Sequence, residues 1–352
     1  MKILYFAPVE KKYFDRWEYY KVDLEILNEL ADTVVVCHSI LEVASVIRRV
    51  DLVYCWWWHR SSHVVLLAKL LRRPVITTGA IHMFDYSGAD DFYKKGLIYR
   101  LAVRIALKYS DANMFISRDQ LRQITSHCEV TCPMLVYPSL GKESSSREES
   151  SGLGGLELTA DDKQRRHFKF VTLCWHTPDQ YVRKGLWETF SALSEPFEHY
   201  TYEWVIIGGD GGGLTDLCAE ISASGLEDRV KPLVDVDRSR INEILATTDL
   251  YLQPSWCEGF GNAVLEAMSF GTPALVSRYT AQPEVVGADG FVCMELTKEG
   301  IKKSIMDFVL MTDRQKTELR TRVADRAKCK FGFANRLFAI NKVIDEAIRD
   351  GS

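Results

Sequence analysis

The stretch that decides the fold runs from Leu250 to Ser277 and reads LYLQPSWCEGFGNAVLEAMSFGTPALVS. Its short apolar run before Pro254 predicts a buried strand. The helix-forming residues from Asn262 onward lead to Gly271, which suits the left-handed cap that ends many helices. The apolar residues after Gly271 predict a further strand, so the stretch is expected to form strand, loop, helix and strand.

Two carboxylates and two glycines give this unit chemical character. Glu258 lies in the predicted loop, while Glu266 lies four residues after Asn262 and shares its helical face. Gly259 and Gly261 allow a ligand to approach the backbone, and the open amides of a first helical turn favour an anion. Acids for sugar hydroxyls and amides for phosphate together indicate a sugar nucleotide. The plain alternative is a helix start with surface glutamates and turn glycines.

The residues around the two acids resemble the signature of the family-4 retaining glycosyltransferases, which has two glutamates separated by seven residues. The matching segments are Pro254-Ser255, Glu258 to Gly261, Leu265 to Met268, and Gly271-Thr272-Pro273. The resemblance implies that Glu266 binds the ribose hydroxyls and Glu258 the donor sugar. It also implies that the amides around Phe260 to Asn262 bind the diphosphate, with no divalent metal and no cofactor besides the nucleotide diphosphate sugar itself.

Bulk properties limit the class of protein. The 352 residues are enough for two domains, and 47% hydrophobic with 26% charged residues is typical of a globular chain. A net charge of -4 gives no general attraction for nucleic acid. We find no signal peptide and no apolar run that could span a membrane, so a cytoplasmic location is expected. The nine scattered cysteines predict buried thiols rather than disulfides or a zinc site.

Strand-like and helix-like runs alternate through both halves of the chain, which predicts an α/β fold with parallel sheets. The polar stretch 142–166 is read as a flexible linker between domains 1–141 and 167–330. The resemblance implies a GT-B fold, in which two Rossmann-like doubly wound domains face a central cleft. The first domain would bind the acceptor and the second the nucleotide sugar, and the terminal helix, 331–352, would pack back toward the first domain.

Two segments of the second half add candidate phosphate contacts. Arg183 and Lys184 lie between a strand and a helix, where a diphosphate needs neutralising, and Lys184-Gly185 matches the family's diphosphate-binding pair. The family usually carries an arginine five residues before that lysine, but Asp179 stands there, and Arg183 is the candidate replacement. Gly209 belongs to the glycine cluster 208–213, which resembles the family's turn beside the nucleotide.

The first half adds three candidates at predicted strand ends and on one helix. His82 matches by position the family histidine near the reacting carbon, with Asp85 three residues later, although a lone histidine is more often structural. The tryptophans of Trp56-Trp57-Trp58 are read as core, as a sugar-stacking surface or as a membrane contact. The segment Phe92 to Tyr109 predicts a basic amphipathic helix, either a solvated face or a peripheral membrane contact.

These observations predict a retaining, metal-independent glycosyltransferase that moves a sugar from a UDP- or GDP-sugar to a hydroxyl acceptor. His82, Lys184 and Glu258 are the predicted catalytic residues, and the acceptor is a carbohydrate or a lipid-linked glycan in polysaccharide or glycoconjugate synthesis. Alternatives on the same fold are a catalytically silent sugar-nucleotide-binding scaffold and a sugar-nucleotide epimerase. A dinucleotide oxidoreductase is disfavoured because Ala7-Pro8-Val9-Glu10 offers no glycine-rich pyrophosphate turn. The same segment lacks the family's Gly-Gly.

Overall fold

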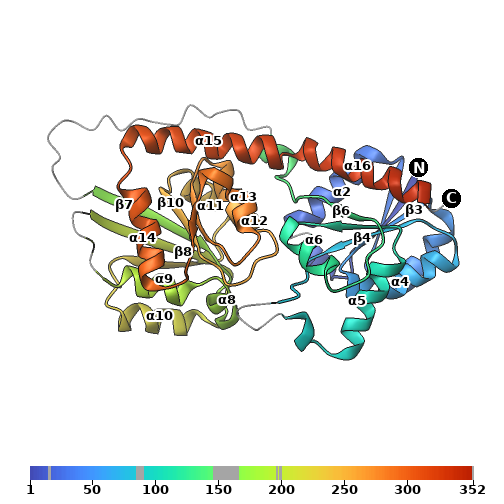
Figure 1. Cartoon of the computed structure of the whole chain (residues 1–352), viewed down its shortest axis with the longest axis horizontal. Helices are drawn as coiled ribbons and strands as arrows, with labels where there is room; N and C mark the ends of the chain where they lie inside the picture. Colours follow the sequence, from blue (N-terminus) through green and yellow to red (C-terminus); the bar gives the residue numbers. More distant parts are fainter. Residues whose placement is uncertain (15–16, 85–90, 146–165, 196, 198–199, 351–352) are drawn as a thin grey trace. The chain divides into compact units, whose positions relative to one another are not determined.

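The computed structural model describes residues 1–14, 17–84, 91–145, 166–195, 197 and 200–350. Asp85 and most of the predicted linker 142–166 therefore lie outside the described residues. The chain forms two compact units, the first made of Met1–Lys142 with Lys330–Ser352 and the second of Glu143–Cys329. Each unit contains a parallel six-stranded sheet with helices against it (Figure 1), so the predicted α/β class is confirmed.

The first unit is a doubly wound sheet in the order β2-β1-β3-β4-β5-β6. Its strands are β1 (Lys2–Phe6), β2 (Thr33–Cys37), β3 (Leu52–Trp56), β4 (Val75–Gly79), β5 (Ala112–Phe115) and β6 (Pro133–Leu135). Its helices are α1 (Lys11–Phe14), α2 (Glu18–Leu30), α3 (Ile40–Val46), η1 (Ile47–Arg49), α4 (Trp58–Leu70), η2 (Phe92–Lys94), α5 (Leu97–Tyr109), α6 (Arg118–Thr125), α7 (Lys142–Ser145) and α16 (Phe333–Asp350). The strand order reverses between β1 and β3, and in such sheets that switch point is where ligands bind.

Alternate residues of these strands enter two separate cores, one on each face of the sheet. Leu4 and Phe6 of β1 pack with the helices of one face. Ile3 and Tyr5 pack with α2 and α16 on the other face. Burial on both faces explains why the strands read as continuous apolar runs in the sequence.

A buried ion pair fastens α16 to the rest of the first unit. Arg336 Nε donates to Asp23 Oδ1 at 2.7 Å, and both side chains are almost fully buried. Arg336 Nη1 also donates to the carbonyl oxygens of Val136 and Tyr137. Residues 330–352 therefore return to the unit formed by the N-terminal half.

The second unit has the strand order β12-β11-β10-β7-β8-β9. Its strands are β7 (Arg166–Leu173), β8 (Tyr200–Gly208), β9 (Val230–Val234), β10 (Leu250–Gln253), β11 (Ala274–Ser277) and β12 (Phe291–Cys293). Its helices are α8 (Pro178–Arg183), α9 (Leu186–Leu193), α10 (Leu214–Ala223), α11 (Arg238–Ala246), α12 (Asn262–Ser269), α13 (Gln282–Val286), η3 (Gly287–Asp289), α14 (Lys298–Val309) and most of α15 (Asp313–Phe331). This is the order of a dinucleotide-binding sheet, with its switch point between β7 and β10.

Two expectations need correction. The segment Phe92 to Tyr109 is not one helix, because the helical turn η2 ends at Lys94 and α5 begins after Gly96, its N-cap residue. The cysteines are not all buried, since Cys218 and Cys329 are exposed. Among the described residues, no helix combines the length and apolarity needed to cross a membrane.

Candidate active site

The deciding stretch folds as predicted into β10, a loop, α12 and β11. Gly261 is the N-cap residue of α12 and has φ 107°, a conformation that strains any residue with a side chain. A Cβ atom at this position would also lie 2.9 Å from Gln282 Cγ. The glycine therefore sets how the chain enters the helix whose first-turn amides are the predicted anion contacts.

A second turn, between α8 and α9, packs against this loop. Gly185 adopts φ 69°, and a Cβ atom on it would lie 2.1 Å from the Pro254 carbonyl oxygen. The Trp256 amide donates to the Arg183 carbonyl at 2.8 Å. Since one turn follows β7 and the other follows β10, the contact lies at the switch point of the second sheet.

Three predicted site residues meet there. Lys184 Nζ lies 3.0 Å from Glu258 Oε1, and Arg183 Nη1 lies 3.7 Å from Glu258 Oε2. The side chains of Lys184 and Glu258 are only 10% and 12% exposed, which strengthens their interaction relative to one in open water. Two cations around one carboxylate leave a net positive charge, so the cluster favours an anionic ligand.

Gln253 is a site residue that sequence reasoning missed. Its Nε2 donates to Glu258 Oε1 at 3.1 Å, and its Oε1 accepts from the Tyr251 hydroxyl at 2.7 Å. Burial holds the pKa of Tyr251 well above its ordinary value, so the phenol stays a donor and fixes the orientation of the amide. The available signal was a fully buried polar residue at the end of an apolar strand.

Glu266 has a cationic neighbour that the sequence did not indicate. Arg238 Nη1, at the start of α11, lies 2.8 Å from Glu266 Oε1. The arginine side chain is 60% exposed and the glutamate side chain 19% exposed. Because this ion pair is largely solvated, it is easily exchanged for a ligand.

The glycine cluster joins the loops that follow β7 and β8. A Cβ atom on Gly208 would lie 1.9 Å from the Cys174 carbonyl oxygen, and one on Gly209 would lie 2.5 Å from the Trp175 ring. The His176 amide donates to the Gly209 carbonyl at 3.0 Å, and the Gly213 amide donates to the His176 carbonyl at 2.8 Å. Close backbone approach therefore explains these glycines, and the nucleotide contact of Gly209 stays a prediction.

Cys174 lies near the cationic turn but is not a candidate nucleophile. Burial raises the pKa of its thiol to about 11, although Lys184 and Arg183 act in the opposite direction. The thiol therefore stays protonated at neutral pH. In the described part of the chain, no group of three His, Cys, Asp or Glu side chains is arranged to hold a metal ion.

His82 belongs to the first unit, where it follows β4. Its carbonyl oxygen accepts from the Phe92 amide at 2.9 Å, and its side chain is half-buried. Asp85 lies outside the described residues. The structure thus assembles Arg183, Lys184 and Glu258 in one cluster of the second unit, and the role of His82 stays a prediction.

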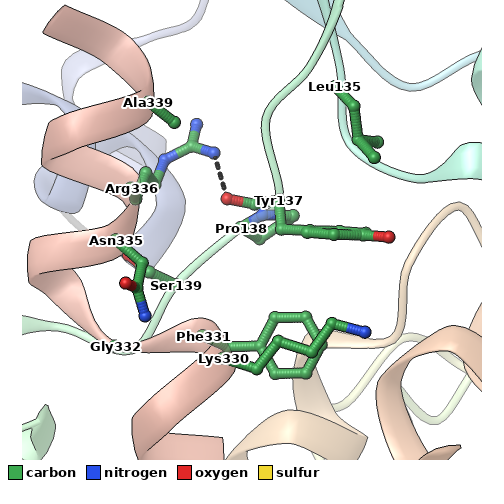
Figure 2. A pocket seen from close by; sticks show the side chains of 10 residues that line it. All are labelled: Leu135, Tyr137, Pro138, Ser139, Lys330, Phe331, Gly332, Asn335, Arg336 and Ala339. Atoms are coloured by element: carbon green, nitrogen blue, oxygen red, sulfur yellow. Dashed lines mark hydrogen bonds between the residues drawn. The ribbon is translucent and has the colours of Figure 1, made fainter.

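A small cavity in the first unit is not the candidate site. It has a volume of about 80 Å³ and lies beside the Arg336 hydrogen bond to the Tyr137 carbonyl (Figure 2). The Lys330 ammonium lies 5.3 Å from the centre of the Tyr137 ring. Ligand pockets usually measure about 300–1,000 Å³, so this cavity is too small for a sugar nucleotide.

Comparison with known proteins identifies the second unit. Residues 183–329 match the family described as "Glycosyl transferases group 1". This part of the chain is a group 1 glycosyltransferase domain. The match begins at the cationic turn and includes Glu258 and Glu266, so the resemblance seen in the sequence is confirmed.

Several relatives of this glycosyltransferase domain carry names of sugar-transferring enzymes. The chain is 29% identical over 180 residues to a GDP-mannose-dependent alpha-(1-6)-phosphatidylinositol dimannoside mannosyltransferase of Mycobacterium tuberculosis, covering 49% of this chain and 46% of that protein. It is 31% identical over 123 residues to a component of the phosphatidylinositol N-acetylglucosaminyltransferase of Arabidopsis thaliana, covering 35% and 28%. The chain thus spans less than half the length of these relatives.

Solved structures show the fold of the whole chain. The chain matches HepE of Anabaena, solved in complex with UDP and glucose, with a TM-score of 0.74 at 19% identity, over 98% of this chain and 99% of that one. It matches sucrose-phosphate synthase of Thermosynechococcus elongatus with a TM-score of 0.76 at 13% identity, over 98% of both chains. These neighbours confirm the predicted GT-B fold.

Proposed function

We propose that this chain transfers a sugar from a nucleotide diphosphate sugar to a hydroxyl group of an acceptor. The observation that carries the proposal is the Arg183, Lys184 and Glu258 cluster at the switch point of the second sheet. Ligands of such sheets bind at this edge, and this edge combines a net positive charge with the N-terminus of α12. The family match over the same residues supports it.

The arrangement suits departure of a diphosphate. When the bond between the sugar and the diphosphate breaks, negative charge develops on the leaving phosphate oxygen. Lys184, Arg183 and the amides from Phe260 to Asn262 would stabilise that charge, as fixed donors do in other active sites. We propose that these two side-chain cations take the place of a divalent metal.

Glu258 and Glu266 would serve as hydroxyl acceptors. A diphosphate that draws Lys184 toward itself leaves Glu258 oxygens to accept from the donor sugar, while Gln253 keeps the carboxylate in place. Ribose hydroxyls would replace Arg238 on Glu266. Retention at the anomeric carbon, and a place for His82 beside it, rest on the sequence resemblance alone.

The donor and acceptor classes follow from the relatives. One is named for GDP-mannose, and one structural neighbour was solved with UDP-glucose, so both bases stay candidates for this chain. Two relatives are named for phosphatidylinositol-based acceptors. We therefore propose a carbohydrate or lipid-linked acceptor and a role in glycoconjugate synthesis.

A lipid-linked acceptor makes the surface of α5 relevant. Leu97, Ile98 and Leu101 are 71%, 86% and 55% exposed, although they are large apolar residues. Arg104 and Lys108 extend the same helix with positive charge, although Lys108 is paired with Glu129. Basic amphipathic helices of this kind lie on anionic membranes, so we propose peripheral membrane contact through α5.

Product analysis tests the proposed function. The full chain is incubated with GDP-mannose, UDP-glucose or UDP-N-acetylglucosamine and a set of glycoside acceptors, and nucleoside diphosphate release and glycoside products are followed by NMR. Transfer with an α-linked product from an α-linked donor supports the proposal. Binding without release would indicate a silent scaffold, and a changed sugar nucleotide without transfer would indicate an epimerase.

A further inference from the structure

The switch point of the first sheet is surrounded by aromatic side chains rather than charges. It lies between β1 and β3, where the strand order reverses. Trp57 follows β3, and Trp17 and Tyr19 lie at the start of α2 on the segment that follows β1. All three side chains are half-buried, so each ring keeps an open part.

Trp57 is held in an unusual conformation. Its φ of 69° and ψ of 92° lie in a region that bulky residues rarely adopt. The Trp57 amide donates to the Thr78 carbonyl at 2.7 Å, and its Nε1 donates to the Tyr20 hydroxyl. Gly79 allows this path, because a Cβ atom there would lie 3.2 Å from Trp57 Cα. Such strain persists where the surroundings enforce it, most often at functional sites.

The rings form one continuous cluster. The centre of the Tyr19 ring lies 4.9 Å from that of Trp56 and 6.3 Å from that of Trp57. Trp17 stacks on Tyr19 at 6.0 Å with an angle of 19° between the ring planes. The aromatic face therefore runs across both loops of the switch point.

A buried polar network supports this face from behind. Asp23 Oδ2 accepts from the Tyr54 hydroxyl at 2.7 Å and from Trp56 Nε1 at 3.1 Å, while Arg336 Nε donates to Asp23 Oδ1. Trp56 is thus fixed at its indole nitrogen, and Tyr19 packs on it. A face held in this way is rigid before any ligand arrives, which lowers the cost of binding.

Polar groups border the rings. Arg60 Nη1 donates to the Pro8 carbonyl at 2.8 Å, and a ring nitrogen of His38 lies 3.0 Å from the Ala7 carbonyl oxygen. The exposed Lys12 and Glu10 form an ion pair at 2.7 Å. An apolar ring surface with polar neighbours suits a ligand that has an apolar face and hydroxyls at its edge, as a sugar ring has.

We propose that Trp57, with Trp17 and Tyr19, forms a stacking surface for a pyranose ring of the acceptor. This rests on the proposed function and adds to it that the acceptor presents a sugar, and not only a lipid or small alcohol, to the first unit. Trp57 acts as a specificity-determining residue, since a ligand without a flat apolar face loses this contact.

The test measures glycoside binding to the full chain by saturation-transfer NMR. The probes are the methyl α-glycosides of mannose, glucose and N-acetylglucosamine. Trp57→Gly removes the ring at a position whose backbone suits glycine, and Trp57→Phe keeps an aromatic face. Trp187→Phe in the second unit is the control. Unfolding temperatures and stabilisation by GDP and UDP are recorded for every variant.

We expect one glycoside to bind the wild type and Trp187→Phe equally, and to bind Trp57→Gly about tenfold more weakly, as loss of an aromatic contact worth about 1.4 kcal/mol implies. Trp57→Phe should recover part of the binding, and nucleotide stabilisation should not change. Unchanged glycoside binding in folded Trp57→Gly overturns the proposal. So does binding of the wild type to phosphatidylglycerol vesicles, but to no glycoside, through Trp57. Absence of nucleotide stabilisation in the wild type counts against the proposed function instead.

Discussion

The two switch points of this molecule are built from different chemistry. In the second unit, Lys184, Arg183 and Glu258 form a cluster of charges bordered by glycine turns. In the first unit, Trp57 and Tyr19 form an aromatic face supported by the buried Asp23 and Arg336 pair. The difference teaches that the same sheet edge can serve a ligand with defined charge in one unit and a ligand with an apolar face in the other.

The largest effect that would break this comparison is expected at Asp23. In Asp23→Asn, the buried Arg336 loses its counter-charge, and the free energy of unfolding should fall by about 3–5 kcal/mol, as when other buried pairs lose one partner. Urea unfolding measures it, with Asp32→Asn at the exposed N-terminal ion pair as the control. A loss below about 1 kcal/mol, typical of surface pairs, would mean that the aromatic face does not depend on this pair.

The charged edge is tested by Lys184→Ala. Because the lysine would stabilise charge that develops on the leaving diphosphate, its removal should lower kcat for sugar transfer by about 100-fold, as for loss of a fixed transition-state donor. Lys231→Ala, at the exposed start of β9, is the control. Equal rates for Lys184→Ala and the wild type would remove the cluster from the mechanism.

A smaller effect is expected at the apolar surface of α5. The double variant Leu97→Ser with Ile98→Ser should reduce sedimentation with phosphatidylglycerol vesicles by about tenfold, since both exposed side chains would enter the lipid interface. Leu41→Ser, which changes another highly exposed leucine of the same unit, serves as control. If both variants bind vesicles as the wild type does, α5 is a solvated helix face.

The smallest effect concerns Glu195, remote from either edge. Hydrogen bonds from Lys298 and Lys302 hold the pKa of Glu195 at about 2, below its ordinary value of 4.5. A depressed carboxyl pKa contributes stability above the unfolded value and loses it as pH falls from about 4.5 to 2. Glu195→Gln should therefore unfold at a lower temperature than the wild type at pH 7, with the difference shrinking below pH 4. A constant difference across that range would contradict the assigned pKa.

Parts of this account were predictable because their chemistry requires particular residues. The strand, loop and helix from Leu250 to Ser277 follow from hydrophobic pattern and glycine, and Lys184 was identified because a diphosphate needs a cation near a helix start. Gln253 and Arg238 were missed, since their roles depend on which loops meet at the switch point. The break before Leu97 was also missed, because the apolar pattern continues across Lys95 and Gly96.

The first unit was harder to interpret for a physical reason. Stacking surfaces require aromatic rings at no fixed spacing, so Trp56-Trp57-Trp58 left core, sugar and membrane roles open. The structure separates them, since Trp56 and Trp58 are buried while Trp57 is half-buried with a positive φ. Neither that backbone conformation nor the return of Arg336 to Asp23, 313 residues away, has a local sequence signal.

The most direct test of the central claim is thermal stabilisation of the chain by GDP, UDP and nicotinamide dinucleotides. A nucleoside diphosphate at 100 times its Kd should stabilise the fold by about 2.7 kcal/mol. We predict stabilisation by GDP or UDP that is lost in Glu266→Ala and kept in Glu243→Ala, a surface control on α11. Stabilisation by neither diphosphate, or by nicotinamide dinucleotides alone, would contradict a sugar-nucleotide site in the second unit.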